Sequence, residues 1–255
     1  MTLGELLTEL RENILHDRSD RVSGESDRLW SDATLVRYIN EAQRRFARLS
    51  LVLRDGTTPD VTQVALETGT TNYTLHESVL AVLSVRHVGD NVDLARAGHA
   101  AFDTYRQPDT YYWDPSGAIT LPAGAPRAWS TDETIGEDNE GSMGATVLRV
   151  YPEPSATYNG DILQMRVIRL PIETFSVNNL KALPELPEDH HLEMLDWAAY
   201  LALRIVDVDL GASNRAAEFR ASFEVSVKMA RDAMMRKVFT PLPWGFGRNG
   251  FSWER

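Results

Sequence analysis

The sequence predicts an α+β protein in which helices from both ends of the chain form one bundle, interrupted by an inserted antiparallel β domain. Apolar residues recur at helical spacing in the first segment of about fifty residues and again after about residue 187. Between about 61 and 170 they occur in short β-branched or alternating runs, separated by Gly, Pro, Asn and Asp. Neither helical half has enough apolar partners alone, so we expect the two halves to pack together.

The first helix is predicted to begin after Thr2, because Glu5 completes the capping-box pattern three residues later. Its apolar residues share one helical face: Leu3, Leu7, Leu10 and Ile14. The polar stretch "HDRSDRVSGESD" then breaks the pattern.

A second helix is predicted to begin after Ser31, a favourable N-cap, with Asp32 in the first turn, where the helix dipole favours a negative charge. Trp30 and Leu35 are placed to form a hydrophobic staple. The apolar stripe continues at spacings of four and three residues: Leu35, Ile39, Ala42, Phe46 and Leu49.

The middle of the chain contains short runs that predict strands: "VTQVAL", "NYTL", "LAVLSVRHV", "GAITL", "TVLRVY" and "ILQMRVIRL". An antiparallel sheet, a sandwich or a small barrel would each fit this pattern. Two long polar excursions, roughly 95–116 and 122–144, interrupt it, and loops of that length usually contact another molecule or are disordered.

A third helix is predicted after "LPELPEDHH", with Pro187 at its first position and Glu188 and Asp189 in its first turn. Gly211 would cap its C-terminus. Its apolar stripe is Leu192, Leu195, Ala199, Ala202 and Val206.

Ser213 is expected to cap a last long helix. One side of this helix is apolar, with Ala216, Phe219, Phe223, Val227, Ala230, Met234 and Val238. The opposite side carries Arg215, Arg220, Lys228, Arg231 and Asp232.

These patterns divide the chain into four predicted segments. They are the N-terminal half of the helical domain (1–56), the β domain (57–179), the C-terminal half of the helical domain (180–238) and an aromatic, glycine-rich arm (239–255).

The predicted arm holds five of the 14 Phe and Trp residues, and its Pro and Gly residues prevent a helix or a long strand. We interpret it as an extended segment that becomes ordered on a partner. Its expected contact residues are Phe239, Trp244, Phe246, Arg248, Phe251 and Trp253. The alternative is a strap that covers a hydrophobic groove of its own subunit.

Composition narrows the function classes. The net charge of −11 disfavours a protein that binds nucleic acid through its phosphates. The absence of Cys excludes disulfides and thiolate metal sites. The N-terminal sequence does not predict a signal peptide, and no apolar run is long enough to predict a membrane anchor. We therefore expect a protein made in a cytoplasm-like setting.

Motifs for catalysis or metal binding are missing from the sequence. Six His residues occur without HExxH spacing, and G-x-S-x-G, Walker A and dinucleotide motifs are absent. Asp207 with Asp209, or Glu188 with Asp189, are conceivable acid–base pairs, but adjacent acids at helix ends more often interact with the dipole or with solvent. The acidic stretch "STDETIGEDNEG" lacks the EF-hand spacing. We expect no enzyme, no cofactor and no metal.

Three segments together resemble the adaptor, or head-to-tail connector, proteins of short-tailed and related bacteriophages. They are "RLWSDATLVRYINEAQRRFARL", "TVLRVYPEP", and "LPELPEDHHLEMLDWAAYLALRIVDVD" followed by "AAEFRASFEVSV". The family's motif in the first segment falls on Trp30, Ser31, Asp32, Asn40, Glu41, Ala42 and Gln43. The resemblance is weakest between about 90 and 145.

The resemblance implies a structural protein of the virion, located at the head–tail interface and assembled in the host cytoplasm. In that family a ring, usually of twelve subunits, docks beneath the portal protein, extends the DNA channel and carries the tail nozzle and its fibres. By analogy, 239–255 would be the arm that docks on the portal. An acidic lumen would let DNA pass during genome ejection without specific binding.

Three other functions are compatible with the sequence. The chain would suit another neck or tail component, such as a nozzle or completion protein. A tail-associated hydrolase and a carbohydrate- or small-ligand-binding β module carried on helices are the alternatives from other classes.

Overall fold

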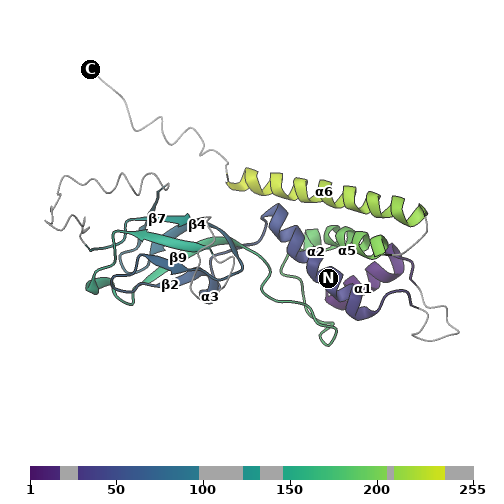
Figure 1. Ribbon diagram of the computed structural model, residues 1–255, viewed down its shortest axis with the longest axis horizontal. Coiled ribbons are helices and arrows are strands. Elements are labelled where there is room, and N and C mark those ends of the chain that lie inside the picture. Colours follow the sequence, from purple (N-terminus) through teal and green to yellow (C-terminus); the bar gives the residue numbers. More distant parts are fainter. Residues whose placement is uncertain (18–27, 98–122, 133–145, 206–209, 239–255) are drawn as a thin grey trace, which may run out of the picture. The chain divides into compact units, whose positions relative to one another are not determined.

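A computed structural model describes residues 1–17, 28–97, 123–132, 146–205 and 210–238. The chain divides into two compact units (Figure 1). The helical unit combines Met1–Val52 with Glu173–Arg255, and the β unit is Leu53–Ile172. Helices from both ends of the chain therefore share one unit, and the strands form the other, which confirms the predicted α+β class.

The first helix is irregular. α1 (Leu3–Thr8) begins with the predicted capping box, in which the Thr2 hydroxyl accepts from the Glu5 amide and the Glu5 carboxylate accepts from the Thr2 amide. It continues into a π-helical segment, η1 (Glu9–Ile14), which the periodicity did not predict. The wider π turn brings both Leu10 and Arg11 to the buried side.

The second helix, α2 (Asp32–Ser50), begins after Ser31 as predicted, and the Ser31 hydroxyl accepts from the Thr34 amide. The predicted stripe is buried as far as Phe46. The prediction for Leu49 was wrong, because Leu49 is 39% exposed and Ser50 occupies the buried position of the last turn. The Ser50 hydroxyl donates to the Phe46 carbonyl at 2.6 Å, so this polar group has a hydrogen-bond partner in its buried position.

The C-terminal helices begin at other residues than predicted. Pro187 precedes a short 3₁₀ turn, η4 (Glu188–His190), before α5 (His191–Ile205) and α6 (Leu210–Val238). Gly211 and Ser213 lie within α6, so their predicted capping roles were wrong. Leu192 is 53% exposed and was wrongly placed on the buried stripe.

The remaining predictions for these two helices are largely confirmed. Leu195, Ala199 and Ala202 of α5 are buried, and Val206 lies outside the described residues. The predicted core residues of α6 that are buried are Ala216, Phe223, Val227, Ala230 and Met234.

The β unit contains two sheets. Sheet A has the order β1 (Arg54–Asp55), β9 (Ile162–Arg169), β4 (Val79–His87), β5 (Val92–Asp93), with β2 (Gln63–Ala65) also paired to β9. Sheet B has the order β3 (Asn72–Thr74), β8 (Val147–Tyr151), β7 (Ala128–Asp132), β6 (Ala95–Arg96). A single helical turn, α3 (Pro59–Thr62), precedes β2.

Most of the described strand pairs are antiparallel, but β6 and β7 are parallel, so sheet B is mixed. The prediction of a polar excursion at 122–144 was partly wrong, since β7 lies within it. Of its five residues Trp129 alone is large and apolar, so the sequence shows no alternating apolar run there. The predicted strand "GAITL" (117–121) lies outside the described residues.

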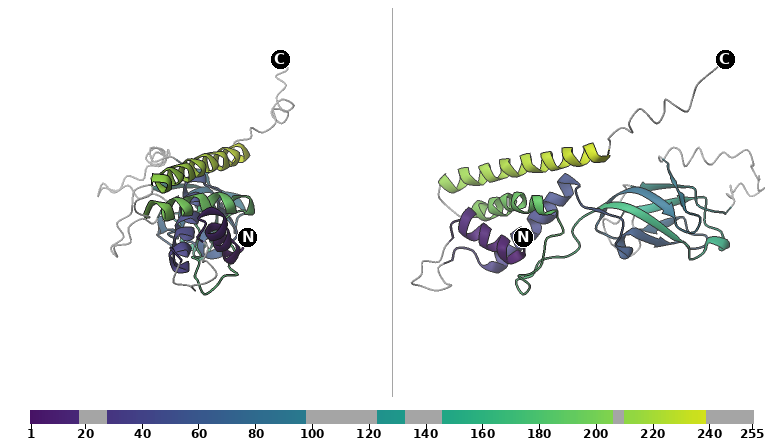
Figure 2. Two further views of the ribbon diagram at one scale, coloured as in Figure 1. Left: turned by 90° about the vertical axis from the view of Figure 1, so that its right-hand side faces the viewer. Right: turned by 180° about the vertical axis from the view of Figure 1, so that it is seen from behind.

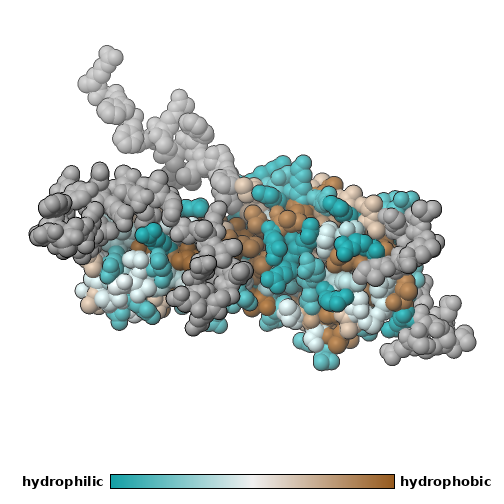
Figure 3. Space-filling view, viewed as in Figure 1, coloured by the Kyte–Doolittle hydropathy of each residue, from teal (hydrophilic) through white to brown (hydrophobic). Residues whose placement is uncertain are grey.

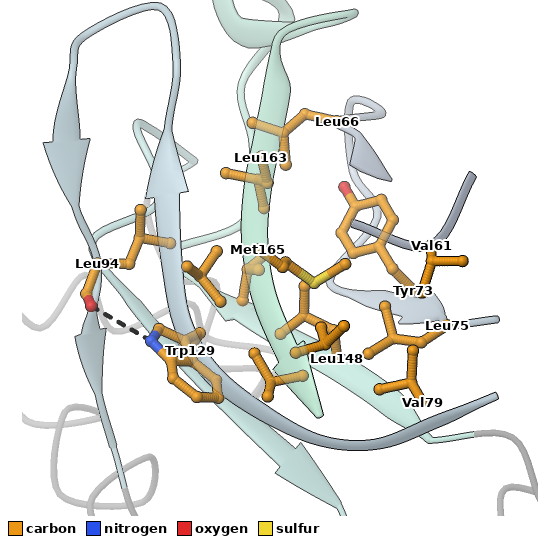
Figure 4. Packing of buried hydrophobic residues seen from close by; sticks show 14 residues of the cluster. Val61, Leu66, Tyr73, Leu75, Val79, Leu94, Trp129, Leu148, Leu163 and Met165 are labelled. Atoms are coloured by element: carbon orange, nitrogen blue, oxygen red, sulfur yellow. Dashed lines mark hydrogen bonds between the residues drawn. The ribbon is translucent and has the colours of Figure 1, made fainter. Parts of the chain in front are cut away.

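One apolar cluster fills the β unit (Figure 4). Leu148 and Val150 of β8 and Leu163, Met165 and Val167 of β9 are almost fully buried at alternate positions. The largest fully buried side chain, Trp129, has its indole N–H donating to the Leu94 carbonyl at 3.2 Å. This bond ties β7 to the segment between β5 and β6.

A buried ion pair fixes the first strand of the β unit. The Asp55 carboxylate accepts hydrogen bonds from the amides of Thr57 (2.8 Å) and Thr58 (3.0 Å), from the Thr58 hydroxyl (2.7 Å) and from the Arg169 guanidinium (2.7 Å). Burial alone would raise the pKa of Asp55, but these hydrogen bonds outweigh it and hold the pKa well below its ordinary value.

Replacing the Asp55 carboxylate should destabilise the β unit. We expect Asp55→Asn to lower the free energy of unfolding by about 3 kcal/mol at pH 7, because Arg169 loses its anionic partner in a buried position. The stabilisation by ionised Asp55 is complete above its ordinary pKa of 3.8 and is lost as pH falls toward the folded-state pKa, so the difference from wild type should narrow below about pH 4.

Urea unfolding at several pH values, followed by circular dichroism, measures this difference. The matched control is Asp93→Asn, whose carboxylate is 79% exposed and 3.8 Å from Arg86. Equal effects of the two substitutions would contradict the role assigned to Asp55.

Candidate assembly surface of the helical unit

The acidic pairs considered as catalytic groups do not form a site in the described structure. Glu188 and Asp189 belong to the exposed η4 turn, and Asp207 and Asp209 lie outside the described residues. Within the described ranges no three His, Asp or Glu side chains are grouped closely enough to hold a metal ion. Most of the acidic stretch (133–140) also lies outside the described residues.

The adjacent histidines both have structural partners. His191 is buried, and its Nε2 lies 2.9 Å from the Leu186 carbonyl oxygen. Burial lowers the pKa of His191, which favours the neutral ring. The Nδ1 atom of His190 lies 2.7 Å from the Glu193 carboxylate. These contacts hold the start of α5 in place.

Helix α5 is the centre of the helical unit. It packs against α6 on one side, against α1 and η1 on the other, and against α2 (Figures 1 and 2). Its residues Met194, Leu195, Ala198, Ala199 and Ala202 have no exposed surface. Because α5 is covered in this way, the surfaces open to a partner are mostly the outer faces of the helices around it.

An aromatic group joins the two halves of the bundle. Phe223 of α6 lies edge-on to Phe46 of α2, with ring centroids 5.9 Å apart, and 5.1 Å from Trp197 of α5. The Arg45 guanidinium lies 3.9 Å above the Trp197 ring, at cation–π distance. The Phe46–Phe223 and Arg45–Trp197 contacts connect residues that are about 180 and about 150 positions apart in the sequence, so each half of the bundle needs the other.

Helix α6 is apolar on two sides. Its buried residues face α5 and α2, while a second apolar row follows the opposite side at every fourth position: Ala217, Ala221, Val225, Met229 and Ala233. Val225 is 56% exposed and Met229 is 67% exposed. A helix that packs only against its own subunit usually has a polar outer face. The second row therefore marks α6 as a contact surface.

The sequence analysis missed this row because it described the side opposite the core stripe only by its charged residues, Arg215, Arg220, Lys228, Arg231 and Asp232. The recurrence of apolar residues at every fourth position was visible in the sequence. On the face drawn in Figure 3, hydrophobic residues lie among hydrophilic ones on the helical unit. Among the described helices, none is long and apolar enough to cross a bilayer.

The expected contact residues of the arm, Phe239, Trp244, Phe246, Arg248, Phe251 and Trp253, lie outside the described residues. Because α6 ends at Val238, the segment that contains them follows directly from this helix in the sequence. The contact role of these residues stays a prediction.

The chain was compared with models of known protein families and with curated proteins. A family model described as SU10 adaptor protein matches residues 1–241, which include the described parts of both units. Five of the six expected arm residues, from Trp244 onward, lie beyond the matched range. No curated protein matches the chain.

The contact between α5 and α6 contains a half-buried acid. Burial raises the pKa of Asp196, a hydrogen bond from Ser222 opposes the rise, and the nearby charge of Glu193 adds to it. We expect Asp196→Asn to raise the melting temperature at pH 7, because Asn keeps an oxygen that accepts from Ser222 and removes the penalised charge.

The increase in melting temperature of Asp196→Asn over wild type should depend on pH. The folded protein holds the Asp196 proton more tightly than the unfolded chain, so wild type loses stability as pH rises from about 3.8 through the folded-state pKa. The gain of the variant should thus vanish below about pH 3.8. Thermal denaturation at pH 3.5 and pH 7 tests this, with the exposed Glu218→Gln as control; a lower melting temperature of Asp196→Asn at pH 7 would rule it out.

Proposed function

Because the chain belongs to the SU10 adaptor protein family, we propose that its copies form a closed ring that joins the portal of a bacteriophage to the tail nozzle. Family membership makes the chain a structural adaptor protein of a phage virion. The ring, its expected number of twelve subunits and its position between portal and nozzle are the parts that we propose. The ring would extend the DNA channel and carry the nozzle with its fibres.

The observation that best supports this proposal is the outer face of α6. The helical unit already has a complete core around α5, yet Val225 and Met229 remain exposed on a helix that is otherwise well packed. Exposed apolar residues in such a row are typical of a subunit whose surface is covered by a neighbour. The same helix leads into the arm, so one element would connect the ring contact to the portal contact.

The charge distribution supports the passage of DNA without binding. The β unit, Leu53–Ile172, contains eight Arg and no Lys against sixteen Asp and Glu, which gives a net charge of −8 of the −11 in the whole chain. An acidic surface repels the phosphate backbone. We propose that acidic residues line the channel, so that the genome slides through it during ejection.

The C-terminal arm is the proposed portal contact. Segment 239–255 combines large aromatic side chains with Arg248 and with three glycines, Gly245, Gly247 and Gly250. Rigid aromatic side chains supply much contact area at little cost in entropy, which offsets the ordering of a flexible segment. We propose that Trp244 and Trp253 act as anchors in pockets of the portal.

Removing the arm should abolish portal binding and leave the helical unit folded. We expect a chain that ends at residue 239 to lose attachment to portal, while its melting temperature stays within about 2 °C of the full chain, because the arm contributes to the interface and not to the core. Pull-down with purified portal and thermal denaturation measure the two effects. A large fall in melting temperature would show instead that the arm is a strap on its own subunit.

Single substitutions within the arm distinguish the residues that anchor it to the portal from those that do not. Trp244→Ala and Trp253→Ala should each weaken portal binding by about 2 kcal/mol, or roughly thirtyfold in Kd. Asn249→Ala, a polar residue of the same segment, serves as the matched control. Binding that is unchanged by either Trp substitution would remove that residue from the interface.

A further inference from the structure

We propose that each subunit of the ring places the outer face of its α6 against the α1 side of the next copy. The α6 face consists of Val225, Lys228, Met229, Arg231 and Asp232. The α1 face consists of Glu5, Glu9, Glu12, Leu180 and Leu183. The inference rests on the proposed ring and identifies the two surfaces that join its neighbours.

The α6 face is apolar with a surplus of positive charge. Val225 and Met229 are more than half exposed. Lys228 and Asp232 are exposed beside them on the same helical face, and Arg231 is exposed on the flank of the helix next to Lys228. Toward the N-terminus of the helix, Arg220 and Glu224 form an ion pair at 2.9 Å and cancel each other. The C-terminal half of α6 therefore offers an apolar row flanked by cations.

The α1 face has the complementary composition. Leu180 and Leu183 are 49% and 64% exposed. Glu5 and Glu12 are exposed on α1 and η1, and Glu9, bonded to the Asn13 amide at 2.6 Å, lies on the same helical stretch. Additional charges next to this face are Lys181, Asp189 and Glu188, and the N-terminal ammonium of Met1 lies 3.7 Å from the Glu188 carboxylate. The acids still outnumber these two cations, so the face has a net negative charge.

The α1 face is built on ordered backbone. The Leu3 amide donates to the Ala182 carbonyl at 2.8 Å, and the Gly4 amide donates to the Leu180 carbonyl at 2.9 Å. A Cβ on Gly4 would lie 3.3 Å from the Leu180 carbonyl oxygen, so this close approach favours glycine. The exposed Leu180 and Leu183 are therefore held at a fixed position beside the first turn of α1.

The two faces cannot meet within one copy. Helix α5 lies between α6 and α1, so the faces are on opposite sides of the helical unit (Figures 1 and 2). Two different complementary surfaces on opposite sides of a subunit form head-to-tail contacts, which close into a ring when the rotation between neighbours allows it. A two-fold pairing of identical faces would stop at a dimer.

Charge selects the head-to-tail arrangement over pairing of like faces. An α6–α6 contact would bring Lys228 and Arg231 against the same cations of the partner copy. An α1–α1 contact would oppose Glu5, Glu9 and Glu12 to their own copies. The contact between α6 and α1 pairs opposite charges around two apolar centres. These charges favour head-to-tail association over association of like faces.

The absence of Cys from the chain allows a direct test by disulfide cross-linking. Val225→Cys and Leu183→Cys are prepared as separate variants, mixed, oxidised and analysed on a non-reducing gel, with the same samples examined by electron microscopy. Both positions are exposed, so the fold should tolerate either substitution. Leu183→Cys mixed with Val88→Cys, which is 51% exposed on the β unit, measures random collision.

We expect cross-linked dimers in the Val225→Cys and Leu183→Cys mixture at about ten times the level of the Val88→Cys control, and a ladder of higher species from the chain that carries both substitutions. Cross-links of Val225→Cys with itself would overturn the proposal in favour of a two-fold contact. If electron microscopy shows rings but no cross-link forms between positions 225 and 183, the assignment of the two faces is overturned, while the proposed adaptor ring still stands. Absence of rings with and without portal would overturn the proposed function as well.

Charge reversal gives a second, independent measurement. The Lys228→Glu, Arg231→Glu variant should need about a tenfold higher concentration for half assembly, as should the Glu9→Lys, Glu12→Lys variant. The chain that carries all four substitutions should recover assembly. If the combined variant assembles no better than either pair alone, the two faces do not meet. Circular dichroism of each variant confirms that the fold is retained.

Discussion

The burial of α5 is the constraint on which the rest of the structure depends. This helix is apolar around most of its circumference, so it is stable in water only when α6, α2 and α1 with η1 cover it. The covering helices come from both ends of the chain, and the β unit lies between them in the sequence. The insertion is tolerated because the Arg169 amide donates to the Leu53 carbonyl at 3.0 Å, so the strands that enter and leave the β unit lie side by side. The two halves of the bundle are thus brought together at a small entropic cost.

Because the other helices cover α5, the residues of the helical unit that can contact another molecule lie mostly on its outer surfaces. The described β unit has its own filled core, and the histidines and acids near the start of α5 have local partners or face solvent. The folding of a single chain does not explain the exposure of the second apolar row of α6 or of the two leucines beside α1. A structural adaptor protein needs such surfaces, because it holds neighbouring proteins of the virion together.

The predictions were correct for features that are determined by residues close together in the sequence. The capping box at Thr2, the N-cap at Ser31 and the stripes of α2 and α6 follow from residue types at fixed spacings, and the structure has them. The errors occurred where tertiary packing decides. The π turn of η1 shifts the buried side, and Leu192 continues the helical spacing at a position that nothing covers. Strand β7 has Trp129 as its only large apolar residue, so its place in the sheet depends on partners distant in sequence. The second row of α6 was readable as a pattern, but its exposure is known only from the packing of the other side.

The most direct test of this account is to remove the β unit. A chain in which a short Gly-Ser linker joins residue 52 to residue 173 retains every helix that covers α5, and the closeness of Leu53 and Arg169 indicates that such a linker is long enough. Thermal denaturation followed by helical circular dichroism should show one cooperative transition, and α5 amides should exchange with solvent more slowly than those of the other helices. A helical signal that declines gradually without a transition, or α5 amides that exchange as fast as those of α1, would contradict the claim that the two ends of the chain form one core around α5.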